Sequence, residues 1–251
     1  TKNIALYSIA GVLYFLLGYN LMYSGVDGGF IGSFSLFDVA DPSTETSEGG
    51  YAGASDWFFQ MVFVATAASI VSGAVAERVK LWPFMVVVVV LTAIIYPIQG
   101  SWTWGAGWLS EIGFSDFAGS TIVHSVGGWC ALVGCLIVGA RKGKYSEDGK
   151  VNPMPASALP LATLGTFLLW FGWFGFNGGS QLALGTFDDA VAISTIFINT
   201  NLAACGGVLV AAIIPRLISG KTDVIMMLNG AIGGLVAITA EPLAPSPLAA
   251  I

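Results

Sequence analysis

Long intervals without a charged residue alternate with short charged segments along the whole chain. There are seven such intervals. Most reach the length of about 20 apolar residues that a helix needs to cross the lipid core of a bilayer. The pattern therefore predicts an all-α integral membrane protein with about seven transmembrane helices. The intervals are residues 3–26, 57–76, 81–110, 117–140, 151–187, 190–215 and 224–240.

Composition strengthens this prediction and excludes a soluble globular class. The chain is 55% hydrophobic and 10% charged, whereas soluble domains carry about 25% charged residues. We expect no cleavable signal peptide, because the first interval follows Lys2 at once and is too long for a signal sequence. The last interval is short by itself, but the mostly apolar stretch Leu243–Ile251 continues beyond Glu241 and Pro242.

The basic residues are distributed asymmetrically. In a chain with seven spans, all nine Lys and Arg fall on one side, and the other side carries acidic residues without any Lys or Arg. The positive-inside rule makes the basic side cytoplasmic. An acidic outer face attracts cations, although loops that avoid Lys and Arg only in order to cross the membrane give the same pattern. The basic residues are Lys2, Arg78, Lys80, Arg141, Lys142, Lys144, Lys150, Arg216 and Lys221.

The chain has one histidine, His124, inside an uncharged run from Phe117 to Ala140. If the fourth span is helical from Asp116, the helical rise places His124 about 12 Å deeper than that residue. This depth is close to the midplane of a hydrocarbon core about 30 Å thick. An ionisable group there is costly and indicates a function. The alternative is a packing histidine that bonds a neighbouring carbonyl.

Several residues that suit cation binding are expected near the outer ends of three spans. An indole face such as that of Trp104 attracts a cation, and the oxygen of Ser180 can accept an N–H bond. Phe176 lies four residues before Ser180 and shares its helix face, and Phe63 lies several residues below the outer surface. Each residue alone is ordinary in a membrane protein, because Trp is common at both interfaces.

The stretch Asp116–Arg141, DFAGSTIVHSVGGWCALVGCLIVGAR, resembles the signature of the ammonium transporter (Amt/Mep/Rh) family, in its bacterial Amt form. The segments FQMVF, SGAVAER, WTWGAGW and FGWFGFNGGS are similar to other segments of that family, in the same order. The resemblance covers essentially the whole chain. It implies an eleven-helix inverted-repeat transporter fold. Residues 1–251 would form a single partial membrane domain that lacks the first helix and the last three.

The resemblance also implies roles for residues near the outer face. Trp104 and Ser180, with Phe63 below them, are similar to an outer site that recruits ammonium. Phe63 and Phe176 are similar to the stacked gate beneath that site. Asp116 resembles a buried acidic residue that orders the site without touching the substrate. As the residue that opens the fourth span, Asp116 also suits a helix N-cap.

His124 resembles the first of two histidines that line the conduction path. The implied function is ammonium or ammonia transport across the cell (inner) membrane. NH4⁺ would be recruited at the cation–π site, deprotonated, and passed through a hydrophobic pore, without a cofactor. The implied partners are the substrate, the lipid bilayer, further copies in a homotrimer and a PII-type signal protein on the cytoplasmic face, with no nucleic acid.

Three other functions are compared with transport. An ammonium sensor of the same fold, with little or no flux, stays open. A gas channel for neutral ammonia or CO2 is disfavoured by Trp104 and Ser180, because that branch of the family generally lacks the aromatic cation site. An enzyme is disfavoured because no base–nucleophile pair or metal cluster accompanies His124. The three cysteines lie within the spans and give no metal spacing.

We predict that residues 141–150 and 216–221 are cytoplasmic and that residues 24–56 are external, because the basic residues all lie on one side. The substitutions Lys144→Cys and Gly49→Cys provide thiols for a reagent that does not cross membranes. We expect labelling in intact cells at position 49, and at position 144 only after the membrane is permeabilised. Labelling of position 144 in intact cells would contradict this topology.

Overall fold

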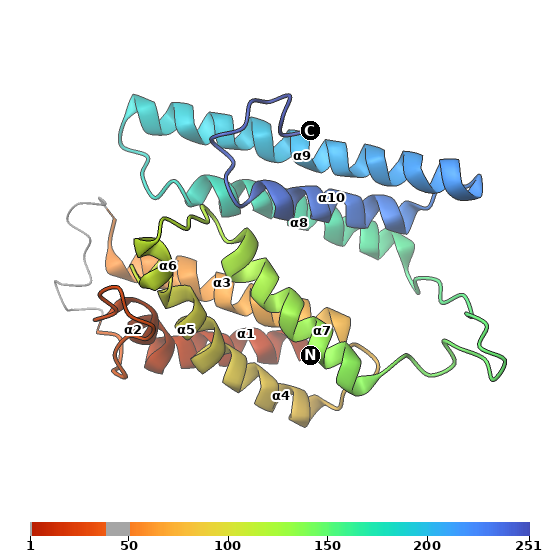
Figure 1. The fold of residues 1–251 in the computed structure, drawn as a ribbon, viewed down its shortest axis with the longest axis horizontal. Coiled ribbons are helices and arrows are strands. Elements are labelled where there is room, and N and C mark those ends of the chain that lie inside the picture. Colours follow the sequence, from red (N-terminus) through yellow and green to blue (C-terminus); the bar gives the residue numbers. More distant parts are fainter. Residues whose placement is uncertain (1, 39–50) are drawn as a thin grey trace. The chain divides into compact units, whose positions relative to one another are not determined.

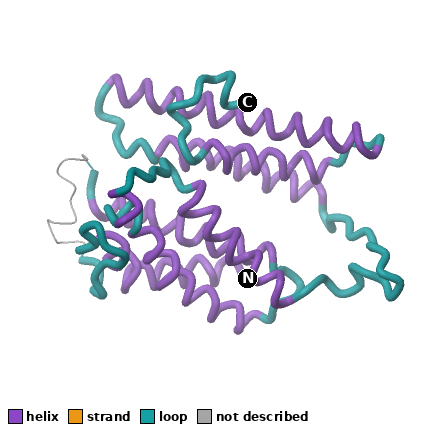
Figure 2. Tube along the Cα trace, viewed as in Figure 1, coloured by secondary structure: helices purple, strands orange, loops and turns teal. Residues whose placement is uncertain are grey.

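A computed structural model describes residues 2–38 and 51–251 of the chain. In these residues the regular secondary structure is helical, with an isolated antiparallel bridge between Tyr145 and Val151, and Figure 2 shows helices joined by loops. Within these ranges, six helical segments are long and apolar enough to cross a membrane, and a further apolar helix has 15 residues. The predicted all-α membrane class is confirmed. Residues 39–50 of the predicted outer segment 24–56 lie outside the described residues.

The chain forms two compact units. Unit 1 contains residues 1–115 and 121–153, and unit 2 contains residues 116–120 and 154–251. In Figure 1 the helices of unit 1 run from red to green and those of unit 2 from teal to blue. The helices of unit 1 are α1 (Lys2–Leu13), η1 (Tyr14–Gly18), α2 (Tyr19–Tyr23), α3 (Gly53–Ala74), α4 (Leu81–Val90), η3 (Leu91–Ile95), α5 (Tyr96–Ser101), α6 (Trp108–Glu111), η4 (Ser120–Ser125, which begins at the boundary) and α7 (Val126–Val138). Those of unit 2 are α8 (Leu159–Gly179), α9 (Phe187–Ser219) and α10 (Val224–Ile238).

The core of unit 1 lies among α1, α3, α4 and α7. Side chains such as Leu6, Val71 and Phe84 are buried there. The outward faces of the same helices are also apolar, and Trp82 and Ile137 are 79% and 80% exposed. A helix that is apolar on all sides suits a surrounding of lipid and protein rather than water. The exposed faces therefore agree with membrane spans.

Three of the spans contain a π-helical turn, at η1, η3 and η4. The turn η3 ends two residues before Pro97, which is in the first turn of α5. A proline has no N–H and its ring crowds the carbonyl four residues earlier, so the regular hydrogen-bond ladder cannot continue unchanged. The bulge at η3 has this physical cause.

The basic residues of unit 1 gather at one end of its helices, as the charge pattern predicts. Lys2, Arg78 and Arg141 stabilise this end, because Lys2 and Arg78 bond carbonyl groups near helix ends and Arg141 pairs with a carboxylate. The contacts are Lys2 Nζ to Ser72 O at 2.8 Å, Arg78 Nη1 to Gly139 O at 2.5 Å, Arg78 Nη2 to Ala74 O, and Arg141 Nε to Glu77 Oε2 at 3.5 Å.

Every predicted span has somewhat different bounds in the structure, and two of the differences have a clear local cause. The interval 151–187 becomes helical only at Leu159, because Pro153 and Pro155 precede it and Pro160 fits the first turn of α8. The interval 190–215 was too short, because α9 extends to Phe187–Ser219. Its additional charges are at helix ends, where they are favourable: acidic residues in the first turn and Arg216 in the last.

The helices α9 and α10 approach each other closely in unit 2. A Cβ atom added at Gly207 would collide with the carbonyl of Gly230, and one added at Gly230 would collide with the carbonyl of Gly207. Small residues at such a crossing let two backbones pack tightly in a membrane. The segment GAIGG, residues 230–234, thus begins at this close crossing.

The apolar tail after α10 does not continue as a helix. Residues 242–251 form turns and fold back along α9, as Figure 1 shows in dark blue. Asn199 Nδ2 donates to the carbonyls of Pro242 and Pro245, at 2.8 and 2.9 Å, and Ala250 packs against Ala203. Prolines in the tail prevent a helical ladder. The tail therefore does not lengthen the seventh apolar helix.

Candidate functional site

Trp104 and Phe63 come together in unit 1, as predicted. Their ring centroids are 5.9 Å apart with an interplanar angle of 41°. Phe63 is 2% exposed, whereas Trp104 is half-buried. Trp104 lies in the turn between α5 and α6, and Phe63 lies on α3. The buried ring of Phe63 thus packs against the Trp104 indole, part of whose surface stays accessible.

Phe176 and Ser180 share the C-terminal end of α8 in unit 2. Ser180 is the C-cap of this helix, and its hydroxyl donates to the carbonyl of Phe176 at 2.8 Å. Phe176 stacks on Trp173 with ring centroids 5.4 Å apart. The predicted common face is therefore confirmed. The hydroxyl proton is used within the helix, so the Ser180 oxygen faces other groups as an acceptor.

The predicted gate combines residues of both units. Phe63 belongs to unit 1 and packs on Phe59, at 4.6 Å between ring centroids, and on Trp104. Phe176 belongs to unit 2. The stacking of Phe63 on Phe176 stays a prediction.

Asp116 is 3% exposed, and its carboxylate is bonded to backbone. Oδ1 accepts from the N–H groups of Gly119 and Ser120, at 3.0 and 2.9 Å. The helix begins at Ser120, so Asp116 lies four residues before it and is not the N-cap residue. Its carboxylate nevertheless satisfies N–H groups at the start of that helix. A buried, ordering role agrees with this geometry.

The depth predicted for His124 was wrong, because it assumed a helix that begins at Asp116. Residues 116–119 are not helical, because the N–H groups of Phe117 and Ala118 bond the carbonyls of Ala240 and Thr239 instead. The helical rise applies only from Ser120, which leaves about 6 Å between that residue and His124. His124 lies within the π-helical turn η4 and is half-buried. Such turns occur frequently at functional sites.

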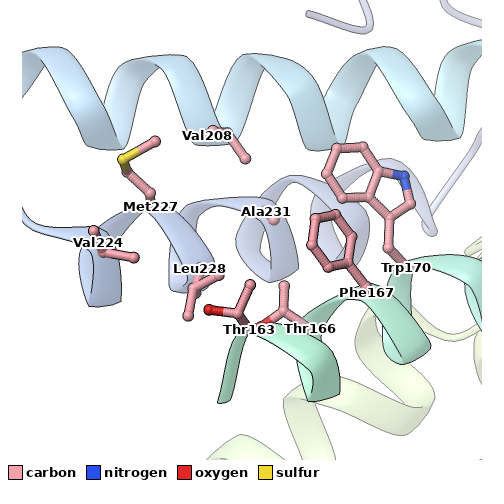
Figure 3. Close-up of a pocket in the computed structure, with 9 residues that line it drawn as sticks. All are labelled: Thr163, Thr166, Phe167, Trp170, Val208, Val224, Met227, Leu228 and Ala231. Atoms are coloured by element: carbon pink, nitrogen blue, oxygen red, sulfur yellow. The ribbon is translucent and has the colours of Figure 1, made fainter. Parts of the chain in front are cut away.

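Two cavities among the described residues are lined by side chains other than the predicted site residues. A cavity of about 190 Å³ in unit 2 lies among α8, α9 and α10 (Figure 3). Its only hydroxyl groups, on Thr163 and Thr166, donate to carbonyls one turn earlier. An apolar groove of about 590 Å³ in unit 1 is lined by residues of α3, α4 and α7 such as Val75, Trp129 and Val133. The described residues also contain no cluster of three or more metal ligands.

Comparison with known proteins decides the family. The sequence profile of the Ammonium Transporter Family matches residues 1–251. The chain belongs to the ammonium transporter family. It is 43% identical to ammonium transporter Amt2 of Archaeoglobus fulgidus over 249 residues, which are 95% of this chain and 51% of that protein. It is 42% identical to a putative ammonium transporter of Synechocystis sp. over 243 residues, with 95% and 54% covered.

Solved structures of this family have the same fold. The Sensor Amt Protein is 41% identical with a TM-score of 0.91, and the match covers 99% of this chain and 61% of that one. Mep2 of Saccharomyces cerevisiae is 29% identical with a TM-score of 0.85, covering 99% and 56%. The chain spans about half the length of the curated relatives it matches. These relatives are transporters and a sensor, not enzymes, and the chain is a multi-pass membrane protein.

Sequence reasoning missed a buried polar network beside Phe176. Trp173 Nε1 donates to Thr239 Oγ1 at 2.7 Å, and Asn177 Nδ2 donates to Thr200 Oγ1 at 2.9 Å. Thr239 Oγ1 also lies 3.0 Å from Asn177 Oδ1. The network joins α8, α9 and α10, and it fixes the face of α8 that carries Phe176. The spacing of four residues between Trp173 and Asn177 was the available signal.

Sequence reasoning also missed a structural role for Asp56, which it treated only as the last residue of the predicted external segment 24–56. The structure places it in the first turn of α3, where it is 7% exposed. Its Oδ2 accepts from the hydroxyl of Tyr19 at 2.7 Å. An acidic side chain near a helix N-terminus is favourable, and the bond ties α2 to α3 at the end that carries Trp104.

Proposed function

We propose that the complete protein transports ammonium or ammonia across the cell (inner) membrane, with both units in one membrane domain. The match of the family profile to residues 1–251 carries this proposal. Its substrate is the small cation NH4⁺, which must be selected over K⁺ of similar radius. The two ions differ because NH4⁺ has four directed N–H donors and a removable proton.

Recruitment uses these differences. The indole of Trp104 attracts a cation by its quadrupole, and the Ser180 oxygen accepts an N–H bond. The bond from the Ser180 hydroxyl to Phe176 O supports this role, because it leaves lone pairs and not the proton for the substrate. An N–H donor gains a directed bond there, whereas K⁺ gains only a single weak ligand in exchange for its water.

Deprotonation follows from the dry path below. An intact charge is costly in the hydrocarbon region, so the ion loses its proton and passes as NH3 through a gate formed by Phe63 and Phe176. An uncharged imidazole at His124 can bond NH3 and relay a proton, since it has one donor and one acceptor nitrogen. Asp116 orders the start of the helix that carries His124.

The second candidate is an ammonium sensor with little or no flux. The likeness to the Sensor Amt Protein supports it. A sensor needs the recruitment site but no complete path. We further propose that the complete protein forms a homotrimer and binds a PII-type signal protein on its cytoplasmic face, as the family resemblance implies.

Trp104→Leu tests the recruitment site in the full-length protein in vesicles. Loss of a cation–π contact should raise the half-saturating ammonium concentration roughly tenfold, with a smaller change in maximal flux. Flux is measured as a function of ammonium concentration, and binding is measured in parallel. A sensor would lose ammonium affinity in the same variant but show no flux in the wild type. Unchanged half-saturation would contradict the recruitment site.

The gate can be tested by crosslinking. We expect the rings of Phe63 and Phe176 to approach within about 4–7 Å between centroids. The double variant Phe63→Cys with Phe176→Cys should then be joined by a bifunctional thiol reagent about as long as the two lost rings, because rings in contact leave their Cα atoms too far apart for a direct disulfide. The matched control pairs Phe63→Cys with Phe171→Cys, an exposed position on α8. Equal crosslinking in both pairs, or none in the first, would refute the gate.

His124 should control flux and selectivity in different ways. His124→Ala removes the proton relay and should mainly lower ammonium flux. His124→Glu introduces a fixed acceptor and should weaken discrimination between NH4⁺ and K⁺, because a carboxylate stabilises either cation. Ion fluxes of the full-length variants decide this. If both variants keep wild-type ammonium flux and K⁺ exclusion, His124 is a packing residue.

A further inference from the structure

We infer that Trp102 is a positioning residue for Trp104, because its indole N–H ties the turn that carries Trp104 to an outer strap, Val26–Phe30. This inference rests on the proposed recruitment role of Trp104. Figure 1 shows α2, α5 and α6 grouped at one end of unit 1, where the strap and the turn meet. The bond between them sets how firmly the Trp104 indole is held toward a cation.

The turn after α5 is closed by its own backbone. Trp104 N–H donates to Gly100 O at 3.0 Å, and Gly107 N–H donates to Ser101 O at 3.0 Å. Ala106 has a φ of +57°, in the left-handed region that residues other than glycine seldom adopt. Such a conformation persists only where the surroundings hold it. The turn therefore needs contacts from outside its own sequence.

The strap supplies these contacts through three consecutive residues. Gly28 N–H donates to Ala106 O at 3.0 Å, and Trp108 N–H donates to Gly29 O at 3.1 Å. The third bond runs from Trp102 Nε1 to Phe30 O at 2.9 Å. The first two bonds join backbone to backbone and are independent of side-chain identity.

Trp102 is the firm side-chain donor to Phe30 O. Ser101 Oγ also lies 3.3 Å from this carbonyl, but it lies 2.7 Å from Ile98 O. A hydroxyl has one proton, so Ser101 satisfies the nearer carbonyl. The indole N–H of Trp102 therefore holds Phe30 O. Trp102 lies two residues before Trp104, whose indole receives the cation in the proposed function.

Trp108 offers a matched control in the same cluster. Its ring contacts both Phe30 and Trp102, at 5.7 and 5.9 Å between centroids. Its own indole N–H is buried and has no hydrogen-bond partner among the described residues. Trp102→Phe therefore removes a bond to the strap, whereas Trp108→Phe makes the same chemical change without losing one.

A second pair of variants tests the same contact through the backbone. A Cβ atom at Gly107 would lie 2.5 Å from Ser101 O and 2.7 Å from Trp102 Cα in the turn, and 2.8 Å from Gly29 O in the strap. Gly107→Ala therefore forces the turn and the strap apart. Gly113→Ala is the control, because Gly113 has a φ of +86° and nothing within 4 Å of the added atom. It introduces backbone strain nearby without separating the strap.

The experiment measures half-saturating ammonium concentration and maximal flux in the full-length protein. We expect Trp102→Phe and Gly107→Ala to raise half-saturation roughly fivefold, as a misaligned cation–π contact predicts, with maximal flux within about twofold. Both controls should match the wild type. In a Trp104→Leu background, Trp102→Phe should add nothing, because a residue that acts through Trp104 couples to it fully.

Two results would overturn the inference. One is wild-type half-saturation for Trp102→Phe while Trp104→Leu is impaired, which leaves the proposed function intact. The other is a loss of maximal flux at constant half-saturation, or an additive effect in the double variant, either of which indicates general damage. If Trp104→Leu itself has no effect, the recruitment site fails, and the positioning role of Trp102 fails with it.

Discussion

A bilayer offers no water to a backbone N–H or C=O group, so each must find a partner inside the protein. Helical ladders satisfy most of these groups in the described residues. Where a ladder stops, a side chain or another stretch of backbone takes over. Arg78 donates to the carbonyl of Gly139 at the end of α7, and Asn199 donates to the carbonyls of Pro242 and Pro245 in the tail. The fold depends on this requirement at every interruption of a helix.

Four of the six candidate functional residues lie at interruptions of helices, whereas Phe63 and Phe176 lie within α3 and α8. Trp104 is in the turn after α5, Ser180 caps α8, His124 is in a π-helical turn, and Asp116 bonds the free donors ahead of that turn. A regular membrane helix presents only side chains, and its polar backbone is closed off. Transporters commonly place their sites where helices break, because oriented polar groups become available there.

The sequence predicted the helices well and their ends less well. Charge-free intervals identify spans because a charge in lipid is costly, but the rule does not mark where a helix begins within an apolar stretch. Residues 117–119 are uncharged, yet they lie outside the helix, because Phe117 and Ala118 bond carbonyls at the end of α10. The tail 242–251 is apolar, yet its prolines make it a loop. Both differences arise from tertiary contacts and local backbone limits, which hydropathy does not record.

The role inferred for Trp102 shows a further limit of sequence reasoning. Every residue has a carbonyl, so nothing in the sequence marks Phe30 as the acceptor for an indole 72 positions away. The motif WTWGAGW presents two similar tryptophans, but the structure gives them different chemistry. Trp104 offers a ring face, which another aromatic ring can partly replace. Trp102 offers an N–H at a fixed reach, which an aromatic ring without a donor cannot supply. The same residue type at two neighbouring positions therefore tolerates different substitutions.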